Sequence, residues 1–205
     1  MLYIRYVYKM LQYGCTLIMS YFYSVKLRML LRINGVSYGL KIRCFNSTPS
    51  LQINRHSGLV SLGNNVVFNS YTDQSWNSRC KLIVLANAIL TVGNNSGMNG
   101  VMVYCSRSVQ IGDNVKIGGG TRISDSNHHS LGFLSRRNPA EDCKYVKSAP
   151  IIIGDDVFIG ANCYIGKGVS IGDRSIVAAG SVVVKSIPSD EIWGGNPAKF
   201  IRKIE

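Results

Sequence analysis

Acidic residues are scarce in this chain and missing from its first 72 positions. Eleven Asp and Glu stand against 23 Lys and Arg in 205 residues, and none of the eleven precedes Asp73. The net charge of +12 raises nucleic acid, an anionic membrane and an anionic ligand as partners. The basic excess is largely N-terminal, and we expect contact with a membrane surface and an anionic ligand, and no nucleic acid.

A hydrophobic run long enough to cross a bilayer is also missing from the N-terminal region. The uncharged stretch of residues 10–25 has 16 residues, whereas a spanning helix needs about 20. Residues 1–33 therefore predict a basic amphipathic helical segment that lies at a membrane interface or caps the first coil of the fold, and both roles stay open. No cleavable signal peptide is evident. We expect a cytoplasmic protein that meets the inner face of the membrane through this segment.

Histidines are few and the cysteines form no paired motif. The six cysteines contain no C-x-x-C, so reduced thiols that are buried or incidental are expected. The three histidines are His56 and the adjacent pair His128 and His129. Three separated histidine ligands for zinc are a poor fit to this distribution, and we expect no metal site.

What the chain has instead is a six-residue period in residues 151–184. An aliphatic residue recurs at every sixth position, with Gly or Ala after the first five, and small or β-branched residues form a second rank four positions into each unit. The aliphatic positions are Ile153, Ile159, Ile165, Ile171, Val177 and Val183; the second rank is Val157, Cys163, Val169, Ser175 and Ser181. This period fits neither a helix nor a strand and indicates a solenoid.

Each hexad has a simple physical interpretation. The aliphatic side chain points into a narrow prism, the small residue occupies a corner, and Gly or Ala beside the aliphatic permits a tight bend. The stretch resembles the hexapeptide-repeat acyltransferases, and the resemblance implies an all-β fold, a left-handed parallel β-helix. Its handedness comes from the resemblance, because parallel crossovers are otherwise right-handed.

The hexads also divide the chain. Residues 1–34 are expected to be the helical segment and residues 35–184 the β-helix, with degraded early repeats and an extended polar loop at 125–150. Residues 185–205 form a C-terminal tail, in which Pro197 favours a short basic helix over 197–204.

The 125–150 loop contains the candidate chemistry. A neutral imidazole can remove a proton from an alcohol, and the histidine pair lies at the mouth of the loop. Adjacent residues of an extended chain point to opposite sides, so one histidine is expected to face a cleft. Two solvated loop histidines are the alternative.

The segment from Asp125 to Leu131 is similar to one in the sugar O-acetyltransferases of the hexapeptide family, including maltose, galactoside, capsular and lipopolysaccharide acetyltransferases. This resemblance assigns the general base to His129, with His128 as second choice because related members use a shorter spacing. Asp125, at the start of the segment, is a weaker candidate for a catalytic role.

The resemblance continues through Ile153–Ala161, Ala179–Pro188 and Gly195–Lys199, and implies a groove for acetyl-CoA between subunits of a homotrimer. Phe158, Gly160, Ala161 and Ala179 would line the pantetheine path. The cations that would meet the phosphates or the adenosine are Lys185, Lys199 and Arg202. The chain departs from the family pattern at Phe158, Ala178 and Val184, where Trp, Gly and Thr are common.

The sequence thus predicts an enzyme that uses acetyl-CoA as co-substrate to acetylate a sugar hydroxyl of a surface polysaccharide or its precursor by direct transfer. Transfer to serine or to an amino sugar is an alternative, and so is a non-catalytic trimeric β-helix scaffold. The acceptor site does not carry over from the family.

Overall fold

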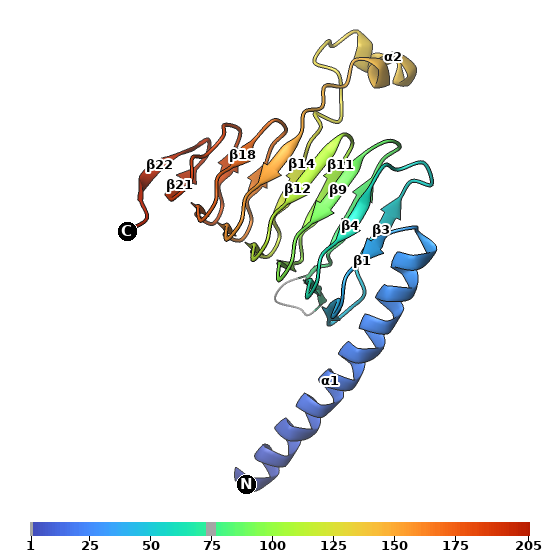
Figure 1. Ribbon diagram of the computed structural model, residues 1–205, viewed down its shortest axis with the longest axis vertical. Coiled ribbons are helices and arrows are strands. Elements are labelled where there is room, and N and C mark those ends of the chain that lie inside the picture. Colours follow the sequence, from blue (N-terminus) through green and yellow to red (C-terminus); the bar gives the residue numbers. More distant parts are fainter. Residues whose placement is uncertain (1, 73–76) are drawn as a thin grey trace.

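Three parallel sheets form the faces of a triangular prism (Figure 1). The computed structural model describes residues 2–72 and 77–205. Successive strands belong to sheets A, B and C in turn, so that each strand pairs with strands one coil earlier and one coil later. The architecture is the left-handed parallel β-helix that the resemblance implied.

The strands of each face are short. Sheet A contains β1 (Ser37–Tyr38), β4 (Val60–Leu62), β9 (Ile89–Val92), β12 (Ser108–Ile111), β15 (Ile151–Ile153) and β18 (Ser170–Ile171). Sheet B contains β2 (Arg43–Phe45), β5 (Val67–Asn69), β10 (Gly97–Asn99), β13 (Lys116–Ile117), β16 (Phe158–Ile159), β19 (Ile176–Val177), β21 (Glu191–Gly195) and β22 (Ala198–Lys203). Sheet C contains β3 (Ser50–Ile53), β8 (Lys81–Val84), β11 (Met102–Cys105), β14 (Arg122–Ser124), β17 (Tyr164–Ile165) and β20 (Val182–Val183). A hairpin of β6 (Tyr71–Thr72) and β7 (Asn77–Ser78) interrupts an early coil.

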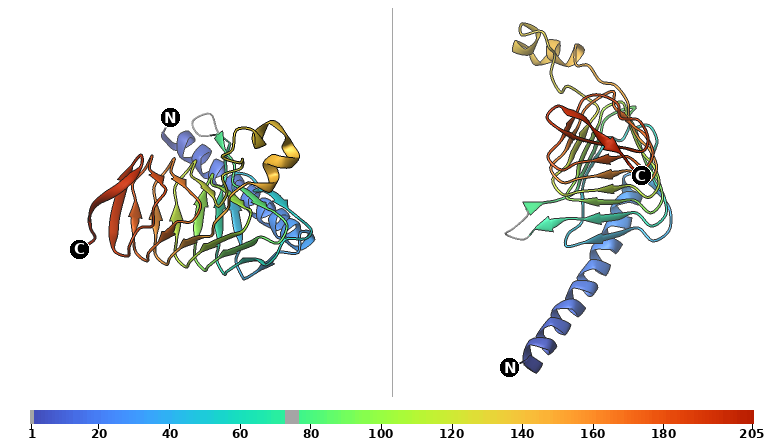
Figure 2. Two further views of the ribbon diagram at one scale, coloured as in Figure 1. Left: turned by 90° about the horizontal axis from the view of Figure 1, so that it is seen from above. Right: turned by 90° about the vertical axis from the view of Figure 1, so that its left-hand side faces the viewer.

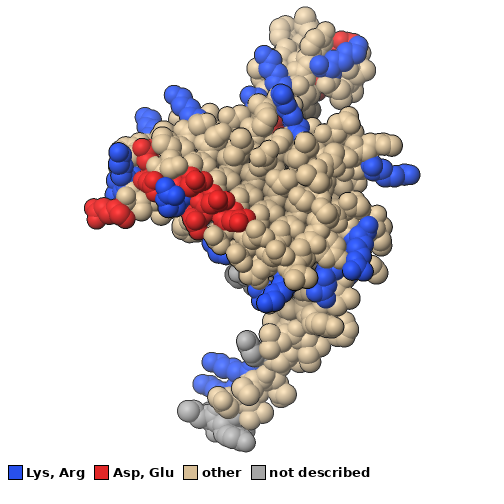
Figure 3. Space-filling view, in the orientation of Figure 1, with Lys and Arg blue, Asp and Glu red and all other residues tan. Residues whose placement is uncertain are grey.

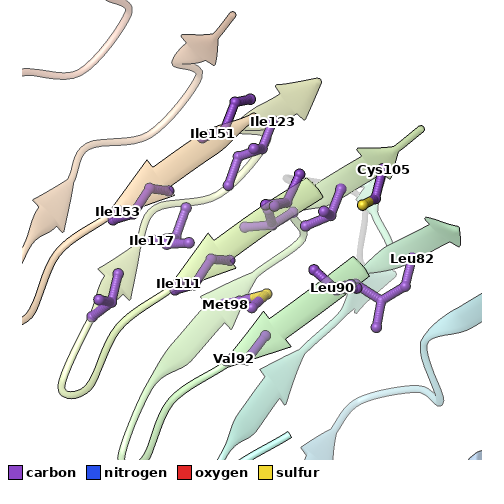
Figure 4. Packing of buried hydrophobic residues seen from close by; sticks show 14 of the residues in the cluster. Leu82, Leu90, Val92, Met98, Cys105, Ile111, Ile117, Ile123, Ile151 and Ile153 are labelled. Carbon is purple, nitrogen blue, oxygen red and sulfur yellow. The ribbon is translucent and has the colours of Figure 1, made fainter. Parts of the chain in front are cut away.

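The hexad aliphatics form the core of the prism, as predicted. All six from Ile153 to Val183 are at most 1% exposed, and every member of the second rank is buried at a corner. Equivalent side chains stack from coil to coil, with Ile117 beside Ile159 and Ile159 beside Val177. Figure 4 shows the same inward ranks in the earlier coils. The period of six is therefore two residues of strand followed by a corner, repeated on each face.

The C-terminal half of the N-terminal helix closes one end of this core. Helix α1 (Leu2–Ile33) confirms the predicted helical segment. Leu27 and Leu31 are 0% exposed and belong to the core cluster. The Ser24 hydroxyl accepts a hydrogen bond from the Cys44 N–H at 2.9 Å, which joins the helix to β2. The N-terminal half projects beyond the prism (Figure 1), and no described helix is both long and apolar enough to cross a membrane.

The prediction of a C-terminal helix over 197–204 was wrong. Residues 198–203 form β22, antiparallel to β21, and β21 itself pairs with β19 as a further coil of sheet B. Gly195, at φ +100°, supports the reversal between the two strands. An end strand without a partner would leave its backbone groups exposed, and the hairpin supplies that partner where a helix could not. The prism therefore extends past residue 184, and Ile187 also bridges to Ile171.

The end-capping role of α1 can be tested by truncating a buried side chain. Leu27→Ala removes a fully buried side chain and should lower the free energy of unfolding by about 2–5 kcal/mol. Met29 is 55% exposed on the same helix, so Met29→Ala should change stability by less than about 0.5 kcal/mol. Denaturant unfolding monitored by circular dichroism measures both, and equal effects would show that α1 does not close the core.

Candidate active site

The long loop is inserted where a strand of sheet C turns into the next strand of sheet A, a position called here the CA corner. It connects β14 to β15 and contains a 3₁₀ turn, η1 (Ser135–Arg137), and helix α2 (Pro139–Lys144). Its two ends are held together, because Asn127 N–H donates to the Lys147 carbonyl and Ala149 N–H donates to the Asp125 carbonyl, both at 3.0 Å. The loop projects from the prism on the side opposite the free half of α1 (Figures 1 and 2). The 26 residues between Ser124 and Ile151 thus leave the scaffold and return to it at one corner.

Helix α2 is short, and its sequence explains why it forms. Asn138 is the N-cap, accepting a hydrogen bond from Ala140 N–H at 2.9 Å, and Pro139 follows in the first turn. Lys144 in the last turn lies 2.6 Å from the Glu141 carboxylate. This helix points one carboxylate, that of Asp142, back toward the mouth of the loop.

His129 and Asp142 form a hydrogen-bonded pair at that mouth. The His129 Nδ1 atom lies 2.6 Å from Asp142 Oδ2, and the Ser130 N–H donates to Asp142 Oδ1 at 2.7 Å. The Asp142 side chain is 11% exposed, whereas the His129 side chain is 69% exposed. An ionised carboxylate can only accept, so Nδ1 carries the proton and the lone pair lies on Nε2. The imidazole is therefore oriented by Asp142 and presents a basic nitrogen to the surface.

The environment of Asp142 stabilises its ionised form. The hydrogen bond from His129 is the largest effect that lowers the pKa of this carboxyl below its ordinary value, and the Ser130 N–H is the next. The Asp142 carboxylate therefore stays charged to lower pH than an ordinary Asp.

His128 faces a different set of partners. It adopts a positive φ of 63°, and its Nε2 lies 2.9 Å from the Ser124 hydroxyl. Its ring is 4.3 Å from the ring of Tyr104 in an edge-to-face contact. The left-handed backbone, in place of an extended one, turns the two histidines apart: His128 lies against sheet C and His129 lies over α2.

Asp125 is fully buried, and its carboxylate is hydrogen-bonded to the preceding coil. Its two carboxylate oxygens accept from the N–H groups of Ser106, Arg107 and Ser108 at 2.6–2.8 Å, and from the Ser106 hydroxyl at 2.9 Å. Four donors leave it no capacity for proton transfer with a substrate. This carboxylate closes the corner below the loop.

Four of the expected CoA-contact residues come together at the corner between sheets B and C, called here the BC corner. Phe158, on β16 of sheet B, is 49% exposed, and Gly160, Ala161 and Ala179 form the adjoining turns. A Cβ on Gly160 would lie 2.5 Å from the Ala179 nitrogen, so the coils here stack too closely for a side chain. In the described chain the N–H groups of Ala161 and Ala179 donate to no backbone carbonyl. An exposed aromatic beside available N–H donors suits an extended amide-containing chain such as pantetheine.

The three expected cations are exposed but lie in two places. Lys199 and Arg202 are on β22, whose Ile201 lies, like Ala178 of the BC corner, beside the position that a Cβ on Gly194 would take. Lys185 follows β20 at the CA corner. Exposed cations beyond the apolar residues fit the phosphates of CoA.

Within one chain, His129 and the BC corner are separated. His129 follows β14 at the CA corner, and the BC corner precedes β14, so the three-residue width of sheet C lies between them. A single prism therefore presents the candidate base at one corner and the candidate CoA-contact residues at another.

Comparisons with known proteins match the repeat and the fold. Residues 150–185 match the family model described as the hexapeptide repeat of succinyl-transferase. Galactoside O-acetyltransferase of Escherichia coli K12 is 40% identical over 100 residues, which cover 47% of this chain and 45% of that enzyme. A hexapeptide-repeat acetyltransferase from Vibrio cholerae, solved with acetyl-CoA, is 38% identical with a TM-score of 0.51 over 57% of this chain and 61% of its own.

These matches confirm the resemblance to the hexapeptide-repeat acyltransferases. The chain spans about half the length of the curated galactoside O-acetyltransferase. The N-acyltransferase AntD of Bacillus cereus aligns over 87% of this chain and 88% of its own, with a TM-score of 0.66 and 22% identity, which shows a shared fold alone.

Sequence reasoning missed Asp142. The signal was present, since Asn138-Pro139 is a helix start and Glu141 and Asp142 are the only acidic residues between Asp125 and Asp155. The spacing of 13 residues between the two partners carries no pattern of its own, because it depends on how the loop folds.

The His129–Asp142 contact predicts a titration result. The Asp142 pKa is lowered. The stabilisation that this pair gives the loop is therefore complete above the ordinary carboxyl pKa of about 4, and it is lost as the pH falls through the lowered value. Carbon-13 NMR of the Asp142 carboxyl should give a midpoint below the ordinary range, and His129→Ala should move it upward. An unchanged midpoint in His129→Ala would show that the contact is not made in solution, and the Glu141 carboxyl is the internal control.

Proposed function

We propose that this protein is an acetyl-CoA-dependent O-acetyltransferase that acetylates a sugar hydroxyl of a surface polysaccharide or its precursor. The observation that carries the proposal is the His129–Asp142 pair at the mouth of a loop on a hexapeptide prism. The relatives named acetyltransferases support the acyl donor, and the galactoside O-acetyltransferase supports a sugar acceptor.

In this proposal His129 acts as the general base. Its Nε2 takes the proton of the acceptor hydroxyl as the oxygen attacks the thioester carbonyl carbon. The carbon–sulfur bond then breaks, and the imidazolium returns the proton to the leaving thiolate. Asp142 holds Nδ1–H and stabilises the transient positive charge on the ring. Backbone N–H groups of a coil corner stabilise the oxyanion, and neither a metal nor a covalent enzyme intermediate takes part.

The site is completed by a second copy of the chain. The separation of His129 from the BC corner within one prism supports a homotrimer in which the CA corner of one copy faces the BC corner of its neighbour. Each trimer would then hold three equivalent sites, with Phe158, Gly160 and Ala161 from one chain and His129 from the next.

Kinetics of three variants test the assignment of the base. His129→Ala should reduce CoA release by about 10²–10⁴-fold or more while CoA affinity stays nearly unchanged. Asp142→Asn should reduce kcat by a similar factor, because the ring loses its orienting acceptor. His128→Ala is the matched control and should retain most of the activity. Release of free CoA is followed with a thiol reagent across a panel of glycan acceptors.

The same assay separates the alternatives. Activity on serine or on amino sugars, in place of glycan hydroxyls, would change the class of acceptor and leave the assignment of His129 as the base unchanged. Absence of CoA binding at millimolar ligand would favour a trimeric scaffold without catalysis. Full activity of His129→Ala would refute the assignment.

A further inference from the structure

Helix α1 has an exposed apolar surface and no acidic residue. The described side chains from Arg5 to Met19 include none that is buried, and Leu17, Ile18, Tyr21 and Phe22 are 49–65% exposed. Among the described residues of the helix, only the stripe Ser20, Ser24, Leu27 and Leu31, at helical spacing, is buried against the prism. The apolar surface that remains is larger than capping the core requires.

A groove runs along the junction of α1 with β2. It has a volume of about 390 Å³ and is lined on the helix by Leu17, Tyr21 and Arg28, and on the other side by Lys41, Arg43 and Phe45. The buried Ser20 hydroxyl, which has no hydrogen-bond partner among the described residues, also lies against it.

The groove is amphipathic along its length. The Tyr38 hydroxyl lies 3.4 Å from the Arg28 carbonyl, whereas Asn46 lies beside Cys15 and Thr16. The chain from 38 to 46 therefore runs back along the helix, and Arg28 and Lys41 share one end while Leu17 and Phe45 share the other. One end attracts anions and the other accepts apolar chains.

The charges around the groove are uncompensated. In the described part of the chain the three ion pairs are His129–Asp142, Lys144–Glu141 and Arg174–Asp190, all far along the sequence from α1. Arg43 donates to the neutral Asn65 Oδ1 at 2.9 Å. A cation cluster without carboxylates favours an anionic partner.

Three of the acidic residues form a ladder over the later coils. It lies at the corner between sheets A and B, where Asp155 Oδ1 accepts from Asp113 N–H at 2.7 Å and Asp173 Oδ1 accepts from Asp155 N–H at 2.9 Å. In the early coils Asn64 and Asn94 take the same place without charge. Figure 3 shows the resulting acidic patch on the later coils and only basic charges along α1.

We propose that the exposed surface of α1 and its basic groove dock the protein onto an anionic lipid bilayer. Residues 10–25 are uncharged and extend about 24 Å as a helix, too short to cross a hydrocarbon core of about 30 Å but suited to lie along its surface. Arg5 and Lys9 before this stretch, and Lys26, Arg28, Lys41 and Arg43 after it, meet lipid phosphates. The active-site loop, on the side of the prism opposite the free half of α1, then points away from the bilayer (Figure 1).

Vesicle binding by the full-length protein tests the proposal. The protein should co-sediment with vesicles of phosphatidylcholine and phosphatidylglycerol, bind vesicles of phosphatidylcholine alone far more weakly, and be released by salt. The triple variant Arg28→Gln/Lys41→Gln/Arg43→Gln should lose about 10- to 100-fold in affinity. The control Arg107→Gln/Arg137→Gln/Lys147→Gln removes the same charge from exposed positions elsewhere and should bind as the parent does.

A second pair of variants tests the apolar contribution. Ile18→Ser/Phe22→Ser should weaken binding, whereas Leu59→Ser/Ile152→Ser, at exposed apolar positions on the prism, should not. An equal loss of vesicle affinity in the basic triple variant and in its control would overturn the proposal, because it would show that binding depends on net charge alone. A change of oligomeric state in Ile18→Ser/Phe22→Ser, seen by sedimentation velocity without loss of vesicle binding, would assign the surface to a second copy instead. CoA release in solution is measured on the same samples, so that failure of docking is distinguished from failure of catalysis.

Discussion

The close stacking of coils at the corners of the prism is the constraint on which the rest of the structure depends. Neighbouring turns approach so nearly that a Cβ on Gly118 or on Gly160 would meet the next backbone at 2.5 Å. Small residues at these corners let every strand pair in register and every aliphatic stack on its equivalent one coil away. At the BC corner the exposed Phe158 side chain lies beside these tight turns, which makes the corner a candidate path for an extended acyl carrier.

A scaffold this regular can accept an insertion only at a corner, and the chemistry depends on that insertion. The loop leaves and re-enters at the CA corner with its ends joined by backbone hydrogen bonds, so the prism keeps the two ends of the loop together. Helix α2 then returns Asp142 to His129, and the ring is oriented by a carboxylate that is itself held by the Ser130 N–H. In the proposed site, the repeats hold the CoA-contact residues and the inserted loop holds the general base.

The sequence predicted the features that repeat and missed those that occur once. The rank of aliphatic residues that includes Ile159 and the rank of small residues that includes Cys163 can be recognised in the sequence, because each recurs every six residues and is buried at every recurrence. The C-terminal strand was mistaken for a helix, because Pro197 suits a first helical turn and the need of β21 for a partner is visible only in three dimensions. His129 could be named from the resemblance, but its orientation could not, because it depends on the positive φ of His128 and on a contact 13 residues away.

We propose that a complete site requires His129 from one copy and the BC corner from another, and subunit mixing can test this. Chains carrying His129→Ala are co-refolded with chains carrying Ala179→Asp, which places a charge on the pantetheine path. Each variant alone should be inactive. In random mixtures about a quarter of the sites would combine an intact base with an intact corner from different chains, and activity should return to that extent. Mixtures as inactive as the separate variants would show that each site is built within one chain, and would contradict the account.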